Sequence, residues 1–449
     1  MIGWLVAIIT GGAAVLAGYL WRRRLIAKLQ KELPYGLPEF LLMNRRQIIA
    51  GLIADPAVQK AVAEEAASAD QPVSTIERRA IRYAKEIAPR FSVFFYFRIG
   101  YVLSKFLLKL HYAECRARFA PDLFSRLDPN ATVVLVPNHR SNMDVLLLLY
   151  LASRTSVVIG GAGEWSRLWP FKALVHLAGG YVVDRRTGDA LYRKVLARFI
   201  AQLTAAGVNQ LVFPEGGLSR DARPKESKLG ILHYVASAYS DSAERDIVFV
   251  PVGINYDRVP EDLRLVRDGG TAFSEHSKLF LVRATVVYLR EVCTLILNRG
   301  GYRYGLACAD YGHPVSWQQW VSWCGYDPGQ LDAASHRRCL EELGRSLMER
   351  IEELIPVTPL TLLARLCLDA PEHLASQKQL TDAFAVAAAT LRDKGQTLMF
   401  SAEEQPKCLT GAIAIFTRLG VLVADDSGWK VAQPLSPLLK YYANAISHL

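Results

Sequence analysis

The sequence predicts an α/β protein: a mostly parallel sheet with helices on both faces, N-terminal membrane-associated helices and a mainly helical C-terminal domain. Between about residues 130 and 320, short Val/Ile/Leu runs alternate with helical stretches, which is typical of parallel sheets. The first positions are strongly apolar, and the chain beyond about 320 has a helical pattern. The expected regions are a membrane segment (1–30), a helical membrane-interfacial region (31–120), the α/β core (121–320) and the helical C-terminal domain (321–449).

Charge is distributed unevenly along the 449 residues. The chain has a net charge of +10, and 51% of its residues are hydrophobic. Residues 1–120 contain 18 Lys/Arg against 9 Asp/Glu, so nearly the whole excess lies at the N-terminal end. A basic, aromatic-rich end suits either nucleic acid or an anionic membrane surface. The seven cysteines show no CxxC spacing, which indicates free thiols in a reducing compartment.

The N-terminal segment from Ile2 to Leu20 carries no charge and is followed at once by Trp21 and three arginines. A span of about 20 apolar residues is needed to cross a bilayer core. No cation precedes the run and no small-x-small cleavage site follows it, so a cleaved signal peptide is not expected. Arginines on the C-terminal side would leave the rest of the chain in the cytoplasm. A buried core helix is the alternative, and glycines within the run weaken the helix.

A second apolar stretch covers residues 91–110. Its only charges, Arg98, Lys105 and Lys109, are spaced by seven and four, which places them in one narrow helical stripe. Aromatic and aliphatic residues surround the stripe, as in a helix that lies in a membrane interface. A core helix with one solvated edge fits this stretch equally well. Together with the N-terminal segment, the pattern favours membrane attachment.

The strands of the core are expected where short apolar runs occur. They are Val133–Val136, Ser156–Ile159, Tyr181–Val183, Leu211–Phe213, Ile247–Ile254 and Leu279–Tyr288. The most regular helical patterns are 55–67, 75–87, 341–353 and 379–392. Near the end, Gly420–Val423 and Trp429–Val431 flank a turn, so a winged-helix-like piece and DNA binding must be weighed. Residues 371–449 carry 7 Lys/Arg and 7 Asp/Glu, so we expect a packing domain without the basic face that nucleic acid requires.

The first candidate for chemistry is the pair His139 and Asp144, in the polar turn after the first core strand. Ligands of α/β sheets bind at the carboxyl ends of strands and at the helix N-termini that follow. A histidine and an aspartate five residues apart could act there as a base and its orienting carboxylate. On spacing alone, a lone histidine in a turn is more often structural.

Three other strand ends also carry polar groups. The stretch Phe213–Arg220 holds two glycines, a serine and an arginine, groups that suit phosphate oxygens. An ordinary turn with solvated charges is the alternative. Gly179–Arg186 ends in two arginines, and Val250–Arg258 is a strand closed by a polar turn. Strand ends converge in a parallel sheet, which is how such a site is built.

The motifs that are missing narrow the chemistry. The sequence contains no G-x-S-x-G elbow and no HExxH or clustered Cys/His motif. We therefore expect neither a metal nor a nucleophilic residue. The combination favours direct attack by a substrate hydroxyl, deprotonated by His139, on an activated acyl group.

Four blocks together resemble the membrane-bound glycerol-3-phosphate acyltransferases (the PlsB type). They are Asn138-His139-Arg140-Ser141-x-x-Asp144, Gly180-Tyr181-Val182-Val183-x-Arg185, Phe213-Pro214-Glu215-Gly216-Gly217-x-Ser219-Arg220 and Val250-Pro251-Val252-Gly253-Ile254-Asn255-Tyr256-Asp257. Their order and spacing match the family, and the likeness extends over most of the chain after about residue 90. The resemblance implies transfer of a fatty acyl group from a CoA or acyl-carrier-protein thioester to the 1-hydroxyl of glycerol 3-phosphate, giving lysophosphatidate.

The resemblance also implies roles for individual residues. His139 would be the general base, with Asp144 as its partner. The expected substrate-binding residues are Arg140, Ser141, Arg185, Arg186, Glu215, Gly216, Gly217, Ser219, Arg220, Lys228 and Pro251, with the arginines on the phosphate. The second block departs from the family, because Asp184 stands where the first of two arginines is usual. The phosphate contact could therefore fall to either of the two arginines that follow.

Other acceptors and a different class of protein remain open. The enzyme could act on lysophosphatidate or dihydroxyacetone phosphate, although Gly217-Leu218-Ser219-Arg220 favours the glycerol-phosphate type because lysophosphatidate-using relatives typically carry Thr after Glu-Gly. It could also be a non-catalytic membrane scaffold of the same fold. The resemblance implies glycerol 3-phosphate, an acyl thioester and a lipid bilayer as partners, without nucleic acid or a further cofactor. It places the protein at the bacterial cytoplasmic membrane, with its catalytic domain facing the cytoplasm. Acyl-chain preference, the type of donor and the oligomeric state are left open.

Overall fold

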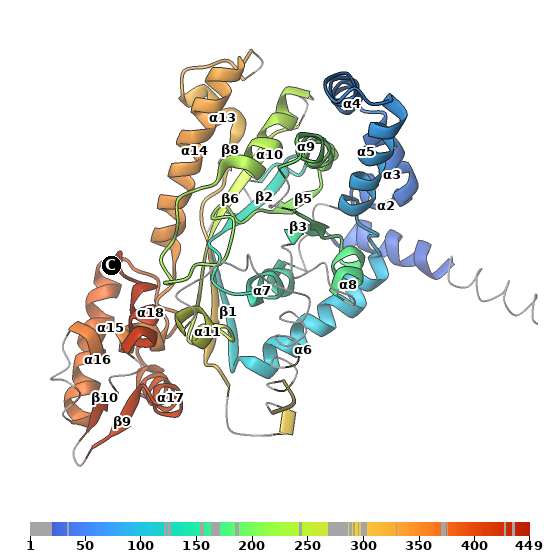
Figure 1. Cartoon of the computed structure of the whole chain (residues 1–449). Helices are drawn as coiled ribbons and strands as arrows, with labels where there is room; N and C mark the ends of the chain where they lie inside the picture. Colours follow the sequence, from blue (N-terminus) through green and yellow to red (C-terminus); the bar gives the residue numbers. More distant parts are fainter. Residues whose placement is uncertain are drawn as a thin grey trace, which may run out of the picture.

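Figure 1 shows the chain as a computed structural model. The structure describes residues 20–449 except 34–35, 121–122, 124–126, 153–156, 163–170, 185–187, 242–244, 268–285, 287–289, 291, 295, 298–302, 329, 370–373, 375, 426–427 and 433–435. The expected membrane segment before residue 20 therefore lies outside the described residues. So do Arg185 and Arg186.

The described residues form one eight-stranded sheet with the order β1-β7-β6-β2-β5-β3-β4, and β8 also pairs with β6. Its strands are β1 (Glu114–Phe119), β2 (Thr132–Pro137), β3 (Val158–Ala162), β4 (Tyr181–Val182), β5 (Asn209–Leu211), β6 (Ile247–Tyr256), β7 (Leu306–Tyr311) and β8 (Val315–Ser316). The five strands from β6 to β4 run parallel. Strands β7 and β8 pair antiparallel with β6, and β1 runs parallel to β7. The predicted mostly parallel sheet is confirmed.

Helices cover both faces of this sheet, as predicted (Figure 1). They are α2 (Glu39–Leu42), α3 (Arg45–Ile53), α4 (Pro56–Ser68), α5 (Val73–Ile87), the π-helical η1 (Phe95–Gly100), α6 (Tyr101–His111), α7 (Met143–Ala152), α8 (Phe171–Leu177), α9 (Ala190–Ala205), α10 (Leu229–Asp241), α11 (Asp262–Arg267), α13 (Trp317–Trp323), α14 (Ala333–Leu354), α15 (Pro359–Asp369), α16 (Gln377–Asp393), α17 (Gln405–Arg418) and α18 (Ser436–Asn444). A further helical stretch covers 20–32.

The alternation of side chains along β2 shows how the two faces are filled. Val133 and Leu135 join one buried cluster with α7, α15, α17 and α18. Val134 and Val136 join the other, with α3 to α5, α9, α10 and α14. Successive side chains of a strand point to opposite faces, so a strand buried on both faces reads as a continuous apolar run. That is why β2 was recognisable in the sequence.

The N-terminal helices pack on the protein itself. Leu25 and Leu29 of the stretch 20–32 are buried in the same cluster as α9. The Trp21 ring contacts that of Phe94 edge to face, with centroids 5.1 Å apart. Among the residues that the structure describes, no helix is both long enough and apolar enough to cross a bilayer.

The predicted cationic stripe lies on the outer surface of η1 and α6. Arg98 and Lys109 are exposed, and Lys105 is half-buried. The same surface also exposes apolar side chains, which we call the α6 apolar face. They are Phe94, Ile99, Val102, Leu103 and Phe106. This surface of η1 and α6 therefore combines exposed apolar side chains with a row of cations.

The C-terminal region is helical and closes with the predicted hairpin. Strands β9 (Leu422–Ala424) and β10 (Trp429–Val431) pair antiparallel. Asp257, at the end of β6, ties this region to the sheet: its carboxylate accepts the backbone N–H groups of Leu306 at 2.7 Å and Leu360 at 2.8 Å. Burial raises the pKa of Asp257 to about 6. Asp257 thus joins β7 and the first turn of α15 at one point.

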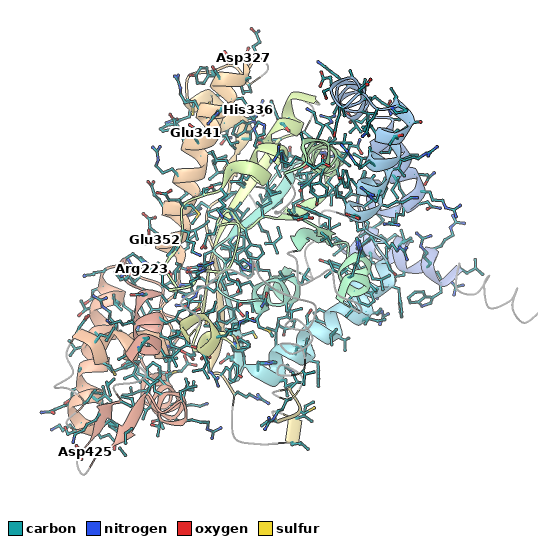
Figure 2. All side chains as sticks on the ribbon, in the orientation of Figure 1. Arg223, Asp327, His336, Glu341, Glu352 and Asp425 are labelled. Carbon is teal, nitrogen blue, oxygen red and sulfur yellow. The ribbon has the colours of Figure 1, made fainter. Side chains whose placement is uncertain are left out.

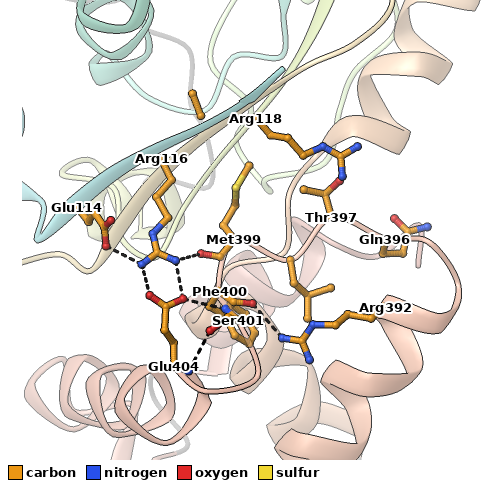
Figure 3. Close-up of a pocket in the computed structure, with 12 residues that line it drawn as sticks. Glu114, Arg116, Arg118, Arg392, Gln396, Thr397, Met399, Phe400, Ser401 and Glu404 are labelled. Carbon is orange, nitrogen blue, oxygen red and sulfur yellow. Dashed lines mark hydrogen bonds and ion pairs between the residues drawn. The ribbon is translucent and has the colours of Figure 1, made fainter. Parts of the chain in front are cut away.

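A cavity of about 620 Å³ lies between β1 and the segment 392–404 (Figure 3). On its wall, Arg116 donates to both carboxylate oxygens of Glu404, at 2.6 and 2.8 Å. These bonds lower the pKa of Glu404 to about 2. This ion pair links β1 to the C-terminal region. The residues that line the cavity include none from the loops after β2 and β5.

The sequence did not predict three strands of the sheet: β1, β7 and the two-residue β8. The β1 sequence, Glu-Cys-Arg-Ala-Arg-Phe, alternates charged and small residues on a half-exposed edge. The β7 sequence contains alanines, a cysteine and an aspartate. Both lack the Val/Ile/Leu run that marked the others. The predicted strand Leu279–Tyr288 lies outside the described residues except for Val286, which is helical, so the prediction is wrong at that residue.

Candidate active site

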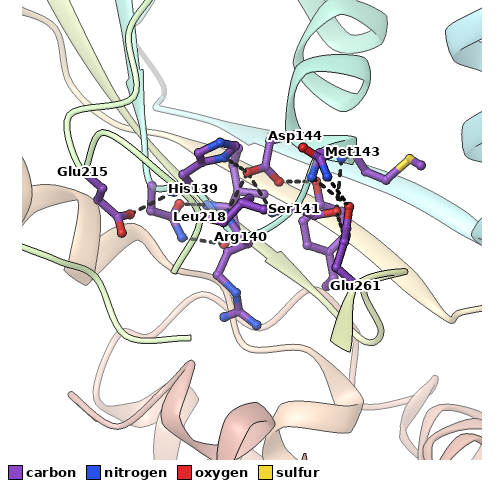
Figure 4. A network of polar contacts seen from close by, with 12 residues as sticks. His139, Arg140, Ser141, Met143, Asp144, Glu215, Leu218 and Glu261 are labelled. Atoms are coloured by element: carbon purple, nitrogen blue, oxygen red, sulfur yellow. Dashed lines mark hydrogen bonds and ion pairs between the residues drawn. The ribbon is translucent and has the colours of Figure 1, made fainter. Parts of the chain in front are cut away.

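His139 and Asp144 meet directly after β2, at the carboxyl edge of the sheet. Strand β2 is flanked by β5 on one side and β6 on the other, so the three strand ends lie side by side. The imidazole Nδ1 of His139 is 2.9 Å from Asp144 Oδ2 (Figure 4). Asp144 occupies the first turn of α7, where a carboxylate is stabilised by the helix N-terminus. The predicted pair is therefore brought together.

Four donors hold the Asp144 carboxylate. Besides His139, the backbone N–H groups of Arg140 and Ser141 donate to Oδ2 at 2.8 and 3.1 Å. The hydroxyl of Tyr256 donates to Oδ1 at 2.7 Å. Asp144 is fully buried. A buried carboxylate needs hydrogen-bond donors in place of water, and these four donors supply them.

The imidazole of His139 is fixed from two sides. Its ring stacks on Phe213, with centroids 4.0 Å apart. Because Nδ1 bonds to Asp144, Nε2 is left without a hydrogen-bond partner among the described residues. The backbone N–H of His139 donates to Glu215 Oε1 at 2.8 Å, and its carbonyl accepts from the Ser219 N–H at 2.8 Å. The loop after β5 is thus attached to the loop after β2.

Glu215 is a buried carboxyl group beside the pair. Its Oε2 has no partner among the described residues. Burial raises the pKa of Glu215 to about 7, although the bond from His139 N–H and the charge of Lys225 oppose the rise. The carboxyl group of Glu215 therefore changes charge near neutrality, next to His139.

The loop from Gly216 to Arg223 contains residues that were predicted to bind phosphate. Gly216 has φ +69°, a left-handed conformation that favours glycine, and the Lys228 side chain lies over it. Arg220 and Lys228 are exposed, and Gly217 is half-buried. The buried Ser219 hydroxyl donates to the Arg223 carbonyl at 2.7 Å. Ser219 thus shapes the loop from inside while the cations face outward.

Arg140 is placed away from the imidazole. Figure 4 shows its side chain directed toward the C-terminal helices. The guanidinium is buried, lies over the Tyr441 ring at 5.2 Å and donates to the Ala222 carbonyl at 3.4 Å. Its Nε and Nη2 have no partner among the described residues. Substrate binding by Arg140 stays a prediction that this placement does not favour.

Ser141 and Pro251 are also internal. The Ser141 hydroxyl donates to Glu261 Oε2 at 2.8 Å and accepts the Met143 N–H at 3.1 Å. Pro251 lies within β6 opposite Val136 of β2. Both residues are buried, Ser141 with its hydroxyl bonded within the protein and Pro251 within the sheet.

Sequence reasoning missed two supporting residues, Tyr256 and Glu261. Glu261 accepts from the Ser141 hydroxyl, and its Oε1 accepts the Asn142 side-chain amide at 2.7 Å. A signal for Tyr256 was available: it stands at an even spacing from Val252 and Ile254 and so shares their face of β6. Glu261 lies in a turn, where no periodicity marks it. Among the described residues, no group of three or more His, Cys, Asp or Glu side chains could hold a metal ion.

Two family models match the chain. The Acyltransferase model matches residues 122–255, which contain His139, Asp144 and the loop after β5. The model of the glycerol-3-phosphate acyltransferase C-terminal region matches residues 291–449. The first model ends before α11 and the second begins after it, so they cover most strands of the sheet and the C-terminal helices.

Curated relatives match along most of the chain. Glycerol-3-phosphate acyltransferase of Pseudomonas putida is 27% identical over 434 residues, which is 91% of this chain and 49% of the relative. That of Xylella fastidiosa is 26% identical over 421 residues, 91% of this chain and 47% of the relative. The chain thus spans about half the length of these relatives.

A solved structure, a 1-acyl-sn-glycerophosphate acyltransferase from Thermotoga maritima, shares 14% identity with a TM-score of 0.31, covering 69% of this chain and 98% of that one. A likeness this weak supports no argument. The two family models and the relatives are consistent with each other and with the four sequence blocks. The chain belongs to the family of glycerol-3-phosphate acyltransferases.

Proposed function

We propose that this chain transfers a fatty acyl group from an acyl thioester to the sn-1 hydroxyl of glycerol 3-phosphate, producing lysophosphatidate. The observation that carries the proposal is the His139–Asp144 pair, 2.9 Å apart within the region matched by the acyltransferase model. The reaction needs no cofactor beyond the thioester, either acyl-CoA or acyl-carrier protein.

In the proposed reaction, His139 acts through Nε2. It removes the proton of the acceptor hydroxyl as the oxygen attacks the thioester carbonyl. Asp144 stabilises the imidazolium and fixes its tautomer. The tetrahedral intermediate then collapses, the C–S bond breaks, and the imidazolium returns the proton to the leaving thiolate. The products are the ester and the free thiol.

The acceptor phosphate is proposed to bind at the loop after β5. The cations of this loop are Arg220, Arg223, Lys225 and Lys228. Arginine suits a phosphate because its guanidinium offers paired donors. Arg185 or Arg186, after β4, is proposed to complete the phosphate site.

An acceptor panel tests this function. The purified full chain in detergent is supplied with acyl-CoA or acyl-carrier-protein thioester and, in parallel, with glycerol 3-phosphate, dihydroxyacetone phosphate or lysophosphatidate. We expect lysophosphatidate to form from glycerol 3-phosphate. Product from only one of the other two acceptors would identify that compound as the substrate. No product with any acceptor would favour a non-catalytic scaffold.

The role of the base is tested by His139→Ala. Removing a general base typically costs at least about a hundredfold in rate, so kcat should fall by that factor. The matched control is His313→Ala, which removes an exposed histidine outside the site and should leave the rate unchanged. A near-wild-type rate in the His139 variant would exclude it as the base.

We also propose that the protein works at the cytoplasmic face of the bacterial cytoplasmic membrane. Support comes from the α6 apolar face with its flanking cations, a pattern suited to anionic headgroups. An acyl donor and a lysophosphatidate product both partition to such a surface. The same proposal includes contact of residues 2–20 with the bilayer, either across it or only into one leaflet. Protease digestion of sealed inside-out and right-side-out vesicles tests the orientation: cleavage only in the inside-out vesicles is expected.

A further inference from the structure

Tyr256, at the end of β6, forms a hydrogen bond with Asp144 of the His139–Asp144 pair. Its hydroxyl donates to Asp144 Oδ1 at 2.7 Å, and both side chains are 0% exposed. Neither the sequence blocks nor the proposed mechanism gives this side chain a role. The contact extends the pair to a line of three groups: His139, Asp144 and Tyr256.

The sheet register explains how a strand residue reaches the first turn of α7. Pro137, the last residue of β2, pairs with Val252, and β6 then runs on for four more residues. Val252, Ile254 and Tyr256 share the face of β6 on which α7 packs. Asn138 holds the extension in place, because its side-chain amide exchanges two hydrogen bonds with the Ile254 backbone, at 2.6 and 3.0 Å.

The two oxygens of Asp144 have different partners. Oδ2 accepts from His139 and from two backbone N–H groups, whereas Oδ1 accepts from Tyr256. The Tyr256 hydroxyl stays protonated, because burial and then the charge of Asp144 raise its pKa well above 10. A donor on Oδ1 fixes the plane of the carboxylate. It also draws charge away from Oδ2, which reduces the stabilisation that Asp144 gives to an imidazolium.

We propose that Tyr256 is a positioning residue of the acyl transfer, which holds Asp144 in plane with the imidazole and moderates the basicity of His139. This inference rests on the proposed function. Tyr256 itself touches neither substrate nor the reacting atoms; it acts through Asp144.

Other ionisable groups surround the pair. Glu215 and Lys225 approach from the loop after β5, and Arg140 from the loop after β2. Glu261 lies before α11 and bonds to Ser141. Tyr112, after α6, and Cys115 of β1 lie near Tyr256. A test must therefore follow His139 itself and must change the Tyr256 hydroxyl alone.

Tyr256→Phe removes only that hydroxyl. We expect kcat/KM to fall by roughly tenfold or more, the scale of a lost hydrogen bond to a charged group. The acid limb of the kcat/KM profile should also move to higher pH, because Asp144 would then stabilise the imidazolium more strongly. The matched control is Tyr311→Phe, which removes the hydroxyl of another buried tyrosine, on β7, that has no partner among the described residues. The control should keep the wild-type profile.

A second readout does not depend on acyl transfer. The titration of His139 is followed by nuclear magnetic resonance of isotope-labelled histidine, with the signal assigned by its loss in His139→Ala. We expect the titration midpoint to rise in Tyr256→Phe and to stay unchanged in Tyr311→Phe. Site-specific 3-fluorotyrosine at position 256 keeps the hydroxyl and should restore the rate.

The outcomes separate the two proposals. If the wild-type chain acylates no acceptor, the proposed function fails, while the titration still tests the contact. If the wild-type chain is active and Tyr256→Phe, with an unchanged unfolding temperature, keeps both the acid limb and the His139 midpoint, the positioning role is overturned.

Discussion

At the scale of single residues, the site contains a carboxyl group whose pKa lies near neutral pH. Glu215 is buried beside the pair, and its pKa is raised to about 7. A carboxyl group whose pKa is higher in the folded than in the unfolded state stabilises the fold below its unfolded pKa. That contribution is lost as the pH rises through the folded value. Glu215 therefore favours folding in mild acid and opposes it in mild base.

Glu215→Gln should remove this pH-dependent contribution to stability. The amide keeps an oxygen for the His139 N–H but cannot ionise. Between about pH 5 and pH 8, the variant should gain stability relative to wild type, by up to about 3 kcal/mol if the pKa difference is fully expressed. Thermal unfolding at several pH values measures the change. Glu226→Gln, at an exposed position of the same loop, is the control and should show no trend. A wild-type-to-variant difference that does not vary with pH would contradict the raised pKa.

At the scale of elements, helix α18 is hydrogen-bonded to the loop after β5, which carries the cations proposed to bind phosphate. Figure 2 shows Arg223 at the border with the C-terminal helices, and its Nη2 donates to Asn444 Oδ1 at 3.3 Å. Asn444 Nδ2 donates to the Asp221 carbonyl at 3.1 Å. Between them, Ala222 is buried with φ +70°, a costly conformation for a residue with a Cβ. The C-terminal region, expected only to pack, therefore also constrains the loop after β5.

Asn444→Ala should loosen that loop. We expect the KM for glycerol 3-phosphate to rise by about fivefold, a loss of about 1 kcal/mol as for one hydrogen bond, with a smaller change in kcat. Lys440→Ala, at an exposed position of the same helix, should leave the KM unchanged. Steady-state rates over a range of acceptor concentrations provide the measurement. An unaltered KM for Asn444→Ala would mean that α18 does not constrain the acceptor site.

At the scale of the whole molecule, one surface combines apolar side chains with cations. Val102 is 60% and Phe106 52% exposed on α6, with Arg98 and Lys109 exposed nearby. Burying such side chains in a bilayer is favourable, at about 25 cal/mol per Å² of apolar area. The α6 apolar face is therefore the part of the described surface that we expect to enter the lipid.

A photoactivatable lipid tests this orientation in the full chain. With the protein bound to anionic vesicles, label should concentrate on peptides that contain the α6 apolar face. The double variant Val102→Asp/Phe106→Asp should reduce that labelling severalfold. Val386, 66% exposed on α16, is the internal control, and its peptide should stay unlabelled. Equal labelling of the peptides containing Phe106 and Val386 would count against a membrane-facing α6. The outcome does not depend on how residues 2–20 meet the bilayer.

The sequence by itself determined the parallel core, and it predicted the His139–Asp144 pair and the loop after β5 as the candidate site. These features are local: β2 reads as an apolar run because both its faces are buried, and His139 and Asp144 are only five residues apart. Strand β6 was recognisable for the same reason, whereas the closing hairpin was recognisable from the turn residues between its two strands. The edge strand β1 was not, because half-exposed positions accept charged residues such as Arg116.

Tertiary structure alone decided what surrounds the pair. Tyr256 meets Asp144 across 112 positions of the chain, and Asn444 meets Asp221 across 223. Tertiary structure also points adjacent side chains in different directions. His139 stacks on Phe213, whereas Arg140 packs against Tyr441 of α18. A motif fixes which residues follow one another, but the direction of each side chain depends on which strands and helices pack around it. For that reason the sequence could predict His139 as a candidate base, whereas only the fold shows what holds its side chain in place.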